Sequence, residues 1–341
     1  MKAICKTVAG PGFEWITAPI PQPQRGEVLI KVHTAAICGT DVHINKWDPW
    51  SQSRIKPPLI FGHEFYGEVV ELGEGVTKVE KGQFVSVEGH FTCGKCYFCK
   101  TGNAHICQDL EIVGVDRDGC FAEYVTVPED NTWLWDIDIT PEVASILDPF
   151  GNAVHTALAT DLIGKNVLIT GMGPIGLCAV MIAKAAGAAK VFATDISEYR
   201  MNLARELGAN RVIDVTKEDS VKIIMDDTKG KGVDVVLEMS GNPKGINDAF
   251  TVLRRGGFFS MLGIPSKPVE INLADAIVFK GATVQGINGR KMYDTWYKAQ
   301  GLLAAGLEIE KVITHRLKFD DIAQGFELMA AGKCGKVVVT M

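Results

Sequence analysis

Residues 1–130 alternate apolar and polar side chains over short runs that glycine and proline interrupt. The runs are rich in β-branched residues and predict strands at 27–33, 67–71, 83–87 and 121–127. Their even, short spacing favours a small antiparallel barrel. We therefore expect an all-β unit at the start of the chain, with its chemistry carried on the connections between strands.

Near residue 150 the pattern changes to buried apolar strands that alternate with helical periods. A strand at 165–170 precedes an alanine-rich helix that ends at about residue 187. Further strands are predicted at 191–194, 211–214, 233–238, 257–263 and 282–287. Strands and helices in this alternation predict an α/β unit with a doubly wound, parallel, six-stranded sheet.

The two patterns predict two domains, which suits a chain of 341 residues. We expect one domain at 1–150 and the parallel sheet at 151–290. Residues 291–341 contain helical segments at about 291–305 and 320–332 and end in a strand. We expect this tail to return to the first domain.

Composition narrows the class of protein. The chain has 47% apolar and 22% charged residues and a formal net charge of −6, which argues against a nucleic-acid-binding surface. Its N-terminus lacks the apolar core of a signal peptide, and no apolar run reaches the roughly 18 residues of a membrane span. Nine cysteines without a secretion signal fit thiols and metal ligands better than disulfides. We expect a cytoplasmic protein that binds neither membranes nor nucleic acid.

Four of the cysteines lie in one polar loop, at Cys93, Cys96, Cys99 and Cys107. Two-residue gaps and a longer return are typical of a compact tetrahedral site with four thiolate ligands. Such a site has no open position, so its metal would stabilise a lobe at about 88–110 rather than act on a substrate. Four unrelated thiols and a nucleic-acid-binding zinc ribbon are the alternatives, and the acidic charge counts against the ribbon.

A second ligand set combines Cys38 with His63 and Glu64. A thiolate, an imidazole and a carboxylate suit a catalytic zinc, which keeps three protein ligands and an open fourth position. Cys38 and the His63–Glu64 pair are too far apart in the sequence to share one helical turn. The fold must therefore bring two separate loops together to form this site. Cys38 alone would be read as a small buried hydrophobe, and His43 alone as a surface histidine.

A glycine-rich turn follows the strand at 165–170. Gly171, Gly173 and Gly176 form a G-x-G-x-x-G motif between strand and helix, and Asp195 ends the next strand. The three glycines would permit the tight turn, the approach of pyrophosphate and the packing of helix on sheet, with the phosphate at the helix N-terminus. Asp195 would bind the adenosine ribose and repel a 2′-phosphate, which favours NAD, although Arg200 could accommodate that phosphate or pair with Asp195.

Other coenzyme contacts are expected where later strands end, because ligands bind at the carboxyl ends of such sheets. The candidate segments follow the strands at 233–238, 257–263 and 282–287. They include Leu262, Gly263, Ile264, Ile287 and Asn288.

Taken together, these motifs resemble the zinc-containing medium-chain dehydrogenase/reductase superfamily over essentially the whole chain. The segments that carry the resemblance are 37–43, 62–65, 87–90, 148–155 and 293–297. It implies a GroES-like β-barrel catalytic domain and a Rossmann domain that binds NAD. The last three segments are similar to members that oxidise L-threonine to 2-amino-3-oxobutanoate and are typically homotetramers.

The resemblance also implies roles for individual residues. Cys38, His63 and Glu64 match a catalytic zinc, the four clustered cysteines match one structural zinc per subunit, and Thr40 and His43 match a proton relay. The coenzyme wall would include Gly171, Gly173, Ile175, Gly176, Asp195, Arg200, Leu262, Ile264 and Ile287, while Asn288 departs from the common family form.

The zinc in this site would make the substrate hydroxyl acidic enough to release hydride to NAD. Asp148 stands where many relatives carry another zinc ligand, and our hypothesis is that Asp148 and Glu64 exchange at the metal. His90, beside Glu88, is a candidate for binding the amino-acid end of the substrate, or is a structural histidine. Two alternatives remain: a polyol or secondary-alcohol dehydrogenase, and a non-catalytic protein that binds NAD and zinc.

Overall fold

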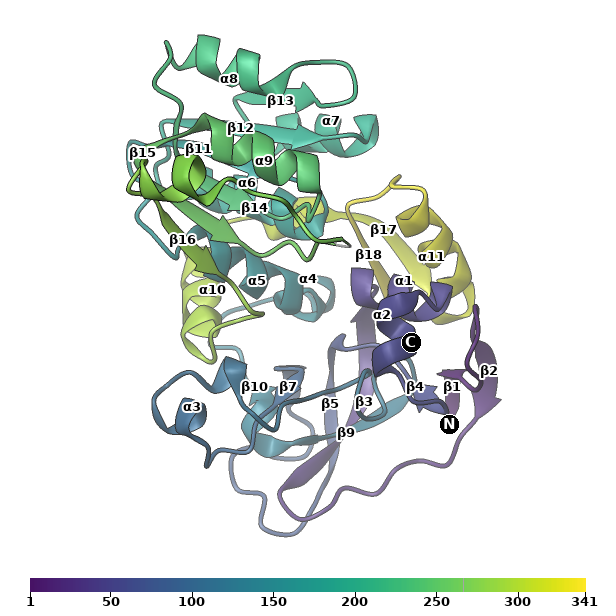
Figure 1. The fold of residues 1–341 in the computed structure, drawn as a ribbon. Coiled ribbons are helices and arrows are strands. Elements are labelled where there is room, and N and C mark those ends of the chain that lie inside the picture. The colour runs from purple at the N-terminus through teal and green to yellow at the C-terminus, as the bar shows by residue number, and fades with distance from the viewer. Residues whose placement is uncertain (266) are drawn as a thin grey trace. The chain divides into compact units, whose positions relative to one another are not determined.

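The computed structural model describes residues 1–265 and 267–341, which divide into two compact units. Unit 1 comprises Met1–Asp148, Ile313–Ala331 and Lys336–Met341, and unit 2 comprises Pro149–Val312 and Gly332–Gly335. Figure 1 shows the elements of both units by label. Among the described residues, no helix is both long and apolar enough to cross a membrane.

Unit 1 is built on a curved sheet of seven strands. Its strands run in the order β10-β6-β5-β3-β18-β17, and β9 also pairs with β3. The bounds are β3 Glu27–Ala36, β5 Glu64–Leu72, β6 Phe84–Val87, β9 Tyr124–Pro128, β10 Thr132–Trp133, β17 Ile313–Lys318 and β18 Lys336–Thr340. The four strands expected from the alternating pattern are all present. The last strand, β18, pairs antiparallel with β3, while β17 was not anticipated.

Smaller elements complete unit 1. A three-stranded sheet has the order β2-β1-β4, and β7 pairs with β8. These strands are β1 Lys2–Lys6, β2 Glu14–Thr17, β4 Leu59–Ile60, β7 His90–Phe91 and β8 Glu111–Ile112. The helices are α1 Gly39–Lys46, α2 Pro49–Arg54, α3 Tyr97–Lys100, α4 Pro141–Ser145 and α11 Ile322–Ala330, with short 3₁₀ turns at Ala104–Ile106, Glu129–Asn131 and Phe319–Asp321.

Unit 2 contains the expected parallel six-stranded sheet, in the order β13-β12-β11-β14-β15-β16. The strands are β11 Asn166–Thr170, β12 Lys190–Asp195, β13 Arg211–Asp214, β14 Val233–Glu238, β15 Leu253–Met261 and β16 Thr283–Gly286. The order reverses at β11, between β12 and β14. This reversal point is where doubly wound sheets bind nucleotides.

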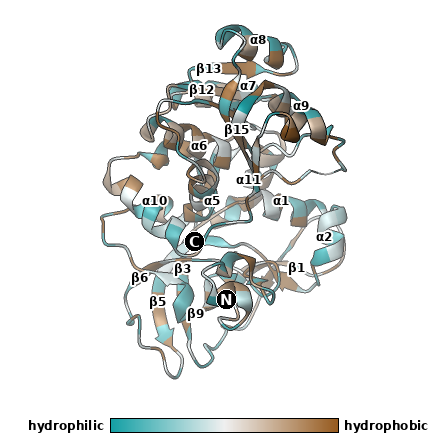
Figure 2. Cartoon of the chain, turned by 60° about the vertical axis from the view of Figure 1, so that its left-hand side comes forward, coloured by the Kyte–Doolittle hydropathy of each residue, from teal (hydrophilic) through white to brown (hydrophobic). Residues whose placement is uncertain are grey.

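The helices of unit 2 are α5 Leu147–Ala157, which begins at the unit boundary, α6 Pro174–Ala185, α7 Glu198–Glu206, α8 Ser220–Asp227, α9 Pro243–Val252 and α10 Asp294–Ala304, with short helical turns η3 Ala274–Val278 and η4 Ile309–Val312. Of these, α6, α7 and α9 pack on strands of the sheet, and α8 packs on α9 (Figure 1). Phe250 of α9 stacks on Phe259 of β15 with ring centroids 4.1 Å apart, inside a core of buried aliphatic and aromatic residues. In Figure 2 β12 is coloured as hydrophobic, whereas α8 carries both colours. A helix with one buried and one exposed face has such a mixed composition.

The boundary between the units differs from the one expected at residue 290. Residues up to Val312 stay with unit 2 because η4 contacts α6 and buries Ile309 and Val312. The chain returns to unit 1 only at Ile313, where β17 begins. Residues Gly332–Gly335 then belong to unit 2 again, between α11 and β18.

Candidate active site and metal centres

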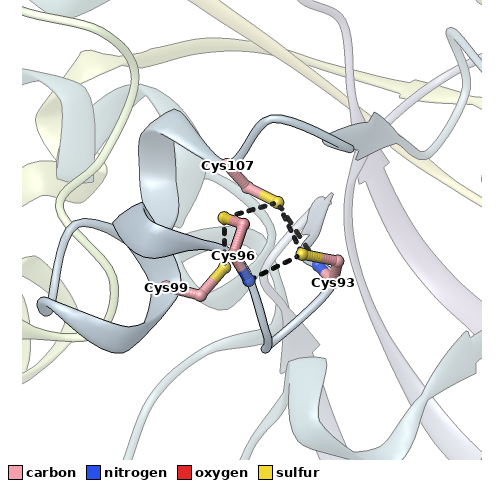
Figure 3. A group of neighbouring side chains, drawn as sticks. All are labelled: Cys93, Cys96, Cys99 and Cys107. Atoms are coloured by element: carbon pink, nitrogen blue, oxygen red, sulfur yellow. Dashed lines mark hydrogen bonds between the residues drawn. The ribbon is translucent and has the colours of Figure 1, made fainter.

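The four clustered cysteines converge on one point, as Figure 3 shows. All four sulfur atoms lie within 4.8 Å of one another. The Sγ atoms of Cys96 and Cys99 are 3.5 Å apart, as are those of Cys93 and Cys107. The turn that brings them together ends at Cys96, which is the N-cap of α3. This set fits a tetrahedral metal shell without an open position.

Backbone amides of the loop donate to these sulfurs. The N–H groups of Cys93 and Asp109 point at Cys107 Sγ at 3.3 and 3.4 Å. Backbone N–H groups of Cys99 and Gln108 lower the pKa of Cys96 to about 6, whereas burial and shared sulfur hydrogen bonds raise the pKa of Cys99 to about 12. Four thiolates this close repel one another and cannot all ionise without a cation, so the donor set suits a divalent metal.

Strand pairing brings the two halves of the second ligand set together. β3 ends at Ala36, two residues before Cys38, and β5 begins at Glu64. In the antiparallel register of these strands Ala36 lies opposite Glu64. Cys38 and the His63–Glu64 pair therefore emerge side by side at one end of the barrel.

The ligand atoms of Cys38, His63 and Glu64 lie within 4.8 Å of one another. His63 and Glu64 are buried, at 6% and 1% exposure. Glu64 Oε1 is buried without a hydrogen-bond donor among the described residues. Because an orphaned carboxylate oxygen in the interior is costly, a cation at this point suits the donor set.

Asp41 supports this ligand set from the first turn of α1. Its Oδ2 accepts a hydrogen bond from the backbone N–H of Cys38 at 2.8 Å, and its Oδ1 lies 3.5 Å from His63 Nδ1. The carboxylate thus lies at ion-pair distance from the ring at Nδ1, and a metal bound at Nε2 would complete the arrangement common around zinc-bound histidines. Burial alone would lower the pKa of His63, but the charges of Asp41 and Cys38 raise it well above its usual range.

A buried lysine, which the sequence reasoning missed, adjoins the same site. Lys336 of β18 is 1% exposed, forms an ion pair with Glu64 Oε2, and donates to the Ile37 carbonyl oxygen at 2.9 Å. Burial alone would lower the pKa of Lys336, but the charges of Glu64 and Cys38 outweigh burial and raise it. Lys336 is therefore a cation in the wall of the candidate zinc site.

Asp148 lies at the start of α5. It is close enough for its charge to act on both Glu64 and Lys336. A divalent metal with the Cys38 thiolate and two carboxylates would carry a net charge of −1. The ammonium of Lys336 offsets this negative charge, which favours a site with two carboxylates.

Thr40 and His43 lie on α1, immediately after the Cys38 ligand. Thr40 Oγ1 is 3.8 Å from Cys38 Sγ, whereas the His43 side chain is 58% exposed. His43 Nδ1 lies 2.5 Å from Asp48 Oδ2. The two candidate relay residues thus span the distance from the metal ligand to the surface of unit 1.

His90 occupies β7 and is anchored by Glu88. Its Nδ1 lies 2.9 Å from Glu88 Oε1, and its backbone N–H donates to the same oxygen at 3.0 Å. Gly89 packs against the backbone of His63, since a Cβ at Gly89 would stand 3.4 Å from the His63 carbonyl oxygen. His90 is therefore next to the segment that carries two of the ligands.

In unit 2 a cavity of about 560 Å³ lies beside the glycine-rich turn. Gly171 has φ of +83°, a conformation that favours glycine, and leads into α6. A Cβ at Gly173 would meet nothing within 4 Å, whereas a Cβ at Gly176 would lie 1.9 Å from the Gly171 carbonyl oxygen. These are the three environments expected for the tight turn, the approach of pyrophosphate and the helix contact.

Asp195 ends β12 at the rim of the cavity. Its Oδ2 accepts the backbone N–H of Met172 at 2.6 Å, and its Oδ1 accepts those of Ile196 and Ser197. Arg200 also lines the cavity, and its Nε donates to the Cys334 carbonyl oxygen at 3.1 Å. Arg200 is therefore held by the C-terminal segment, not by Asp195.

The loops after β14 and β15 are joined by Glu238, which is fully buried. Its Oε1 accepts hydrogen bonds from Ser240 and Gly241, and its carbonyl oxygen accepts the N–H groups of Leu262 and Gly263. Ile264 is 87% exposed, Ile287 is 7% exposed and Asn288 is exposed. The expected coenzyme contacts outside the lining of the cavity beside Gly171 are Leu262, Gly263, Ile264, Ile287 and Asn288, together with Ile175 and Gly176.

Met239 and Ser240, in the loop after β14 where ligands are expected to bind, also line the cavity. Other residues of the lining were not anticipated individually. They lie at or after the ends of β12 and β13 and on α8 and α9, and they include Thr194, Ile196, Val215, Thr216, Ser220, Asn242, Lys244 and Asp248. Position near the end of a parallel strand is the signal that most of them share, and it applies to many residues equally.

Both halves of the chain match known families. Residues 24–137 match the alcohol dehydrogenase GroES-like domain, and residues 174–305 match the zinc-binding dehydrogenase family. The solved structure of a short chain alcohol dehydrogenase from Escherichia coli with the cofactor NADH is similar over 100% of this chain and 99% of that one, with a TM-score of 0.91 and 29% identity. The chain belongs to the zinc-containing medium-chain dehydrogenase/reductase superfamily.

Relatives within this superfamily are more specific. An L-threonine 3-dehydrogenase of Caldanaerobacter subterraneus is 50% identical over 99% of this chain and 98% of its own length. An L-threonine 3-dehydrogenase of Bacillus subtilis is 48% identical, with the same coverage. The resemblance inferred from the motifs is thereby confirmed.

Proposed function

We propose that this protein oxidises L-threonine at its 3-hydroxyl with NAD and gives L-2-amino-3-oxobutanoate and NADH. The observation that carries the proposal is the cluster of half-buried Cys38 with buried His63 and Glu64, in which Glu64 Oε1 has no hydrogen-bond donor among the described residues. The nucleotide-type cavity beside Gly171 supports NAD as the oxidant, and the full-length similarity to threonine dehydrogenases supports the substrate.

A zinc ion bound by these three residues would lower the pKa of a coordinated hydroxyl from about 15.7 towards about 7. Cys38 and neutral His63 would hold the ion, with Asp41 fixing the ring through Nδ1. Thr40 would accept the hydroxyl proton and pass it on, and His43 would deliver it towards water. In unit 2, Asp195 and Arg200 would orient the adenosine end of the coenzyme.

The third ligand position is where two carboxylates compete. Glu64 pairs with Lys336, and Asp148 is near enough to influence both. We propose that Glu64 and Asp148 exchange at the metal. Lys336 would form its ion pair with Glu64 when Asp148, and not Glu64, is the metal ligand. In a fully metallated Asp148→Asn variant, turnover should fall, and wild-type turnover there would remove Asp148 from the mechanism.

We propose that His90 contacts the amino-acid end of the substrate. Its Nδ1 lies 2.9 Å from Glu88 Oε1, which fixes the orientation of the ring beside the segment that carries His63 and Glu64. His90→Ala should raise KM for L-threonine more than KM for a simple secondary alcohol. An equal rise for both substrates would assign His90 a structural role.

A substrate panel distinguishes the proposed reaction from its nearest rival, a polyol or secondary-alcohol dehydrogenase. NADH formation should be fastest with L-threonine, because a zwitterion uses charged groups that a diol does not. A zinc chelator should abolish the reaction. Zinc and NAD binding without turnover on any alcohol would instead support a non-catalytic protein.

We propose that the protein assembles as a homotetramer, with the edge of unit 2 as one contact. β16 is an edge strand of its sheet, and apolar side chains around it are exposed. They include Leu273 at 60%, Val278 at 68%, Phe279 at 71% and Val284 at 39%. An exposed apolar edge of this kind suits pairing with a second copy. Phe279→Glu should lower the mass measured by light scattering, and an unchanged mass would exclude this edge.

We also propose a cytoplasmic location. Among the described residues none of the nine cysteines forms a disulfide, which suits a reducing compartment. Recovery of the protein in a membrane or secreted fraction would contradict this assignment.

A further inference from the structure

Two polar residues at the junction of α1 and α2 form a close pair on the surface of unit 1. α1 ends at Trp47 with φ of 57°, and Asp48 is the N-cap of α2. The two carboxylate oxygens of Asp48 have different partners. Oδ1 accepts the backbone N–H of Ser51 at 3.0 Å, and Oδ2 lies 2.5 Å from His43 Nδ1.

The ring of His43 is restrained on a second side. Trp50 meets it edge to face, with ring centroids 6.2 Å apart. The imidazole is nevertheless 58% exposed, so its other nitrogen is accessible. One nitrogen is thus engaged by an acid and the other is free to exchange protons.

We propose that Asp48 is a positioning residue for proton transfer, which holds His43 with the proton on Nδ1 and presents Nε2 as the acceptor. A carboxylate accepts but does not donate, so the shared hydrogen must reside on Nδ1 in the neutral ring. The inference rests on the proposed oxidation and deepens it. Asp48 would serve His43 as the buried acid serves the histidine of a hydrolase triad.

The proton balance is simple. The substrate O–H bond breaks as its proton moves along the relay, and an N–H bond forms at His43 Nε2. The imidazolium keeps Nδ1–H against Asp48 and later gives the Nε2 proton to water. NAD, when bound, would accept the hydride of the carbinol carbon with its electron pair, separately from this proton.

The acids on the elements around His43 differ from Asp48 in the partners that they face. On α1, Asp41 faces His63, and Lys46 carries the opposite charge. Arg54 of α2 forms an ion pair with Asp116. Helix α11 packs against α1, and its acidic residue is Glu327. The acid within ion-pair distance of His43 is Asp48.

The carboxylate is also set up to stay ionised. Burial would raise the pKa of Asp48, but the Ser51 N–H and the His43 ring outweigh burial and lower it. An ionised Asp48 is the state that holds the ring in the proposed tautomer.

Two substitutions separate positioning from helix capping. Serine is a good N-cap, so Asp48→Ser should retain the cap of α2 and lose the contact to His43. Asp48→Asn can keep Oδ1 on Ser51 while its amide donates to His43 Nδ1, which should reverse the tautomer. ¹⁵N NMR of the His43 ring in the zinc-loaded protein reads the tautomer directly, whether or not the enzyme turns over.

The wild-type ring should show a protonated Nδ1, and Asp48→Asn should shift the proton to Nε2. kcat should fall roughly tenfold or more in both variants. This loss is smaller than the roughly 10²–10⁴-fold contribution of a general base itself, because Asp48 acts only through His43. Added imidazole should restore part of it, with zinc content and NAD affinity unchanged. His43→Ala provides the reference, since Asp48→Ser should add no further loss in that background.

A wild-type ring protonated on Nε2, or variants with wild-type tautomer and turnover, would overturn the role of Asp48. Loss of turnover that imidazole cannot rescue, in a variant of normal tautomer, would make Asp48 structural only. If the wild-type protein fails to oxidise L-threonine, the proposed function fails, and the NMR result still decides the positioning claim.

Discussion

Lys336 of β18 and Glu64 of β5 form a buried ion pair, although the two residues come from opposite ends of the chain. β3 connects their strands, because it pairs with β5 on one side and β18 on the other. The C-terminal strand thus delivers a cation to the ligand set that the N-terminal strands assemble. This pairing gives the first prediction.

Lys336→Met should destabilise the metal-free protein by about 3–5 kcal/mol, because it leaves Glu64 buried without its counter-ion. Zinc supplies the missing positive charge, so the loss should be smaller in the loaded protein. Urea denaturation with and without chelator measures both values. Lys336→Arg is the matched control and should restore part of the stability. Equal losses with and without zinc would contradict the pairing.

Zinc binding at Cys38, His63 and Glu64 should depend on pH. Asp41 and Cys38 raise the pKa of His63 well above its usual range, against the effect of burial, so the metal-free ring is protonated at neutral pH. Zinc must displace that proton, and its affinity should therefore rise with pH. Competition with a colorimetric chelator between about pH 6 and pH 8 tests this, because a ring with a raised pKa still carries the proton that zinc must displace at neutral pH. Affinity independent of pH would contradict the assignment of His63 as a ligand.

The two metal sites should respond separately to substitution. The wild-type protein should contain about two zinc ions per chain, and Cys96→Ser and Cys38→Ser should each lose about one. Cys96→Ser should unfold its own loop and lower stability, whereas Cys38→Ser should abolish turnover with the lobe intact. Elemental analysis and protease sensitivity at 93–107 distinguish them. Loss of both ions from either variant would show that the sites are coupled.

Two glycines of the turn before α6 offer a matched pair. A Cβ at Gly173 meets nothing, so Gly173→Ala should cost less than about 1 kcal/mol yet weaken NAD binding by roughly tenfold or more, because it obstructs the pyrophosphate. A Cβ at Gly176 meets the Gly171 carbonyl oxygen, so Gly176→Ala should cost about 1–3 kcal/mol in stability. Thermal denaturation and NAD titration give both numbers. The reverse pattern would contradict the assigned roles.

The features that the sequence predicts correctly are those set by residues close together in the chain. The cysteine loop and the turn at Gly171, Gly173 and Gly176 are each confined to a few residues, so their geometry follows from the motif. The parallel sheet follows from strands that alternate with helices. The barrel follows from short alternating runs, as at 27–33.

Long-range pairing accounts for what could not be predicted. The meeting of Cys38 with His63 depends on the register of β3 with β5, which no short motif contains. Lys336 stands in an apolar strand, and its role appears only when β18 pairs with β3. β17 escaped prediction because charged residues interrupt its apolar pattern. The hydrogen bond from Arg200 Nε to the Cys334 carbonyl oxygen likewise joins two distant parts of the sequence.

The most direct test of the central claim is NADH formation from L-threonine and NAD by the zinc-loaded protein, compared with Cys38→Ser. The account predicts steady NADH growth for the wild-type protein and none for the variant, which should still bind NAD with unchanged affinity. Undiminished turnover by Cys38→Ser, with its zinc site empty, would contradict it.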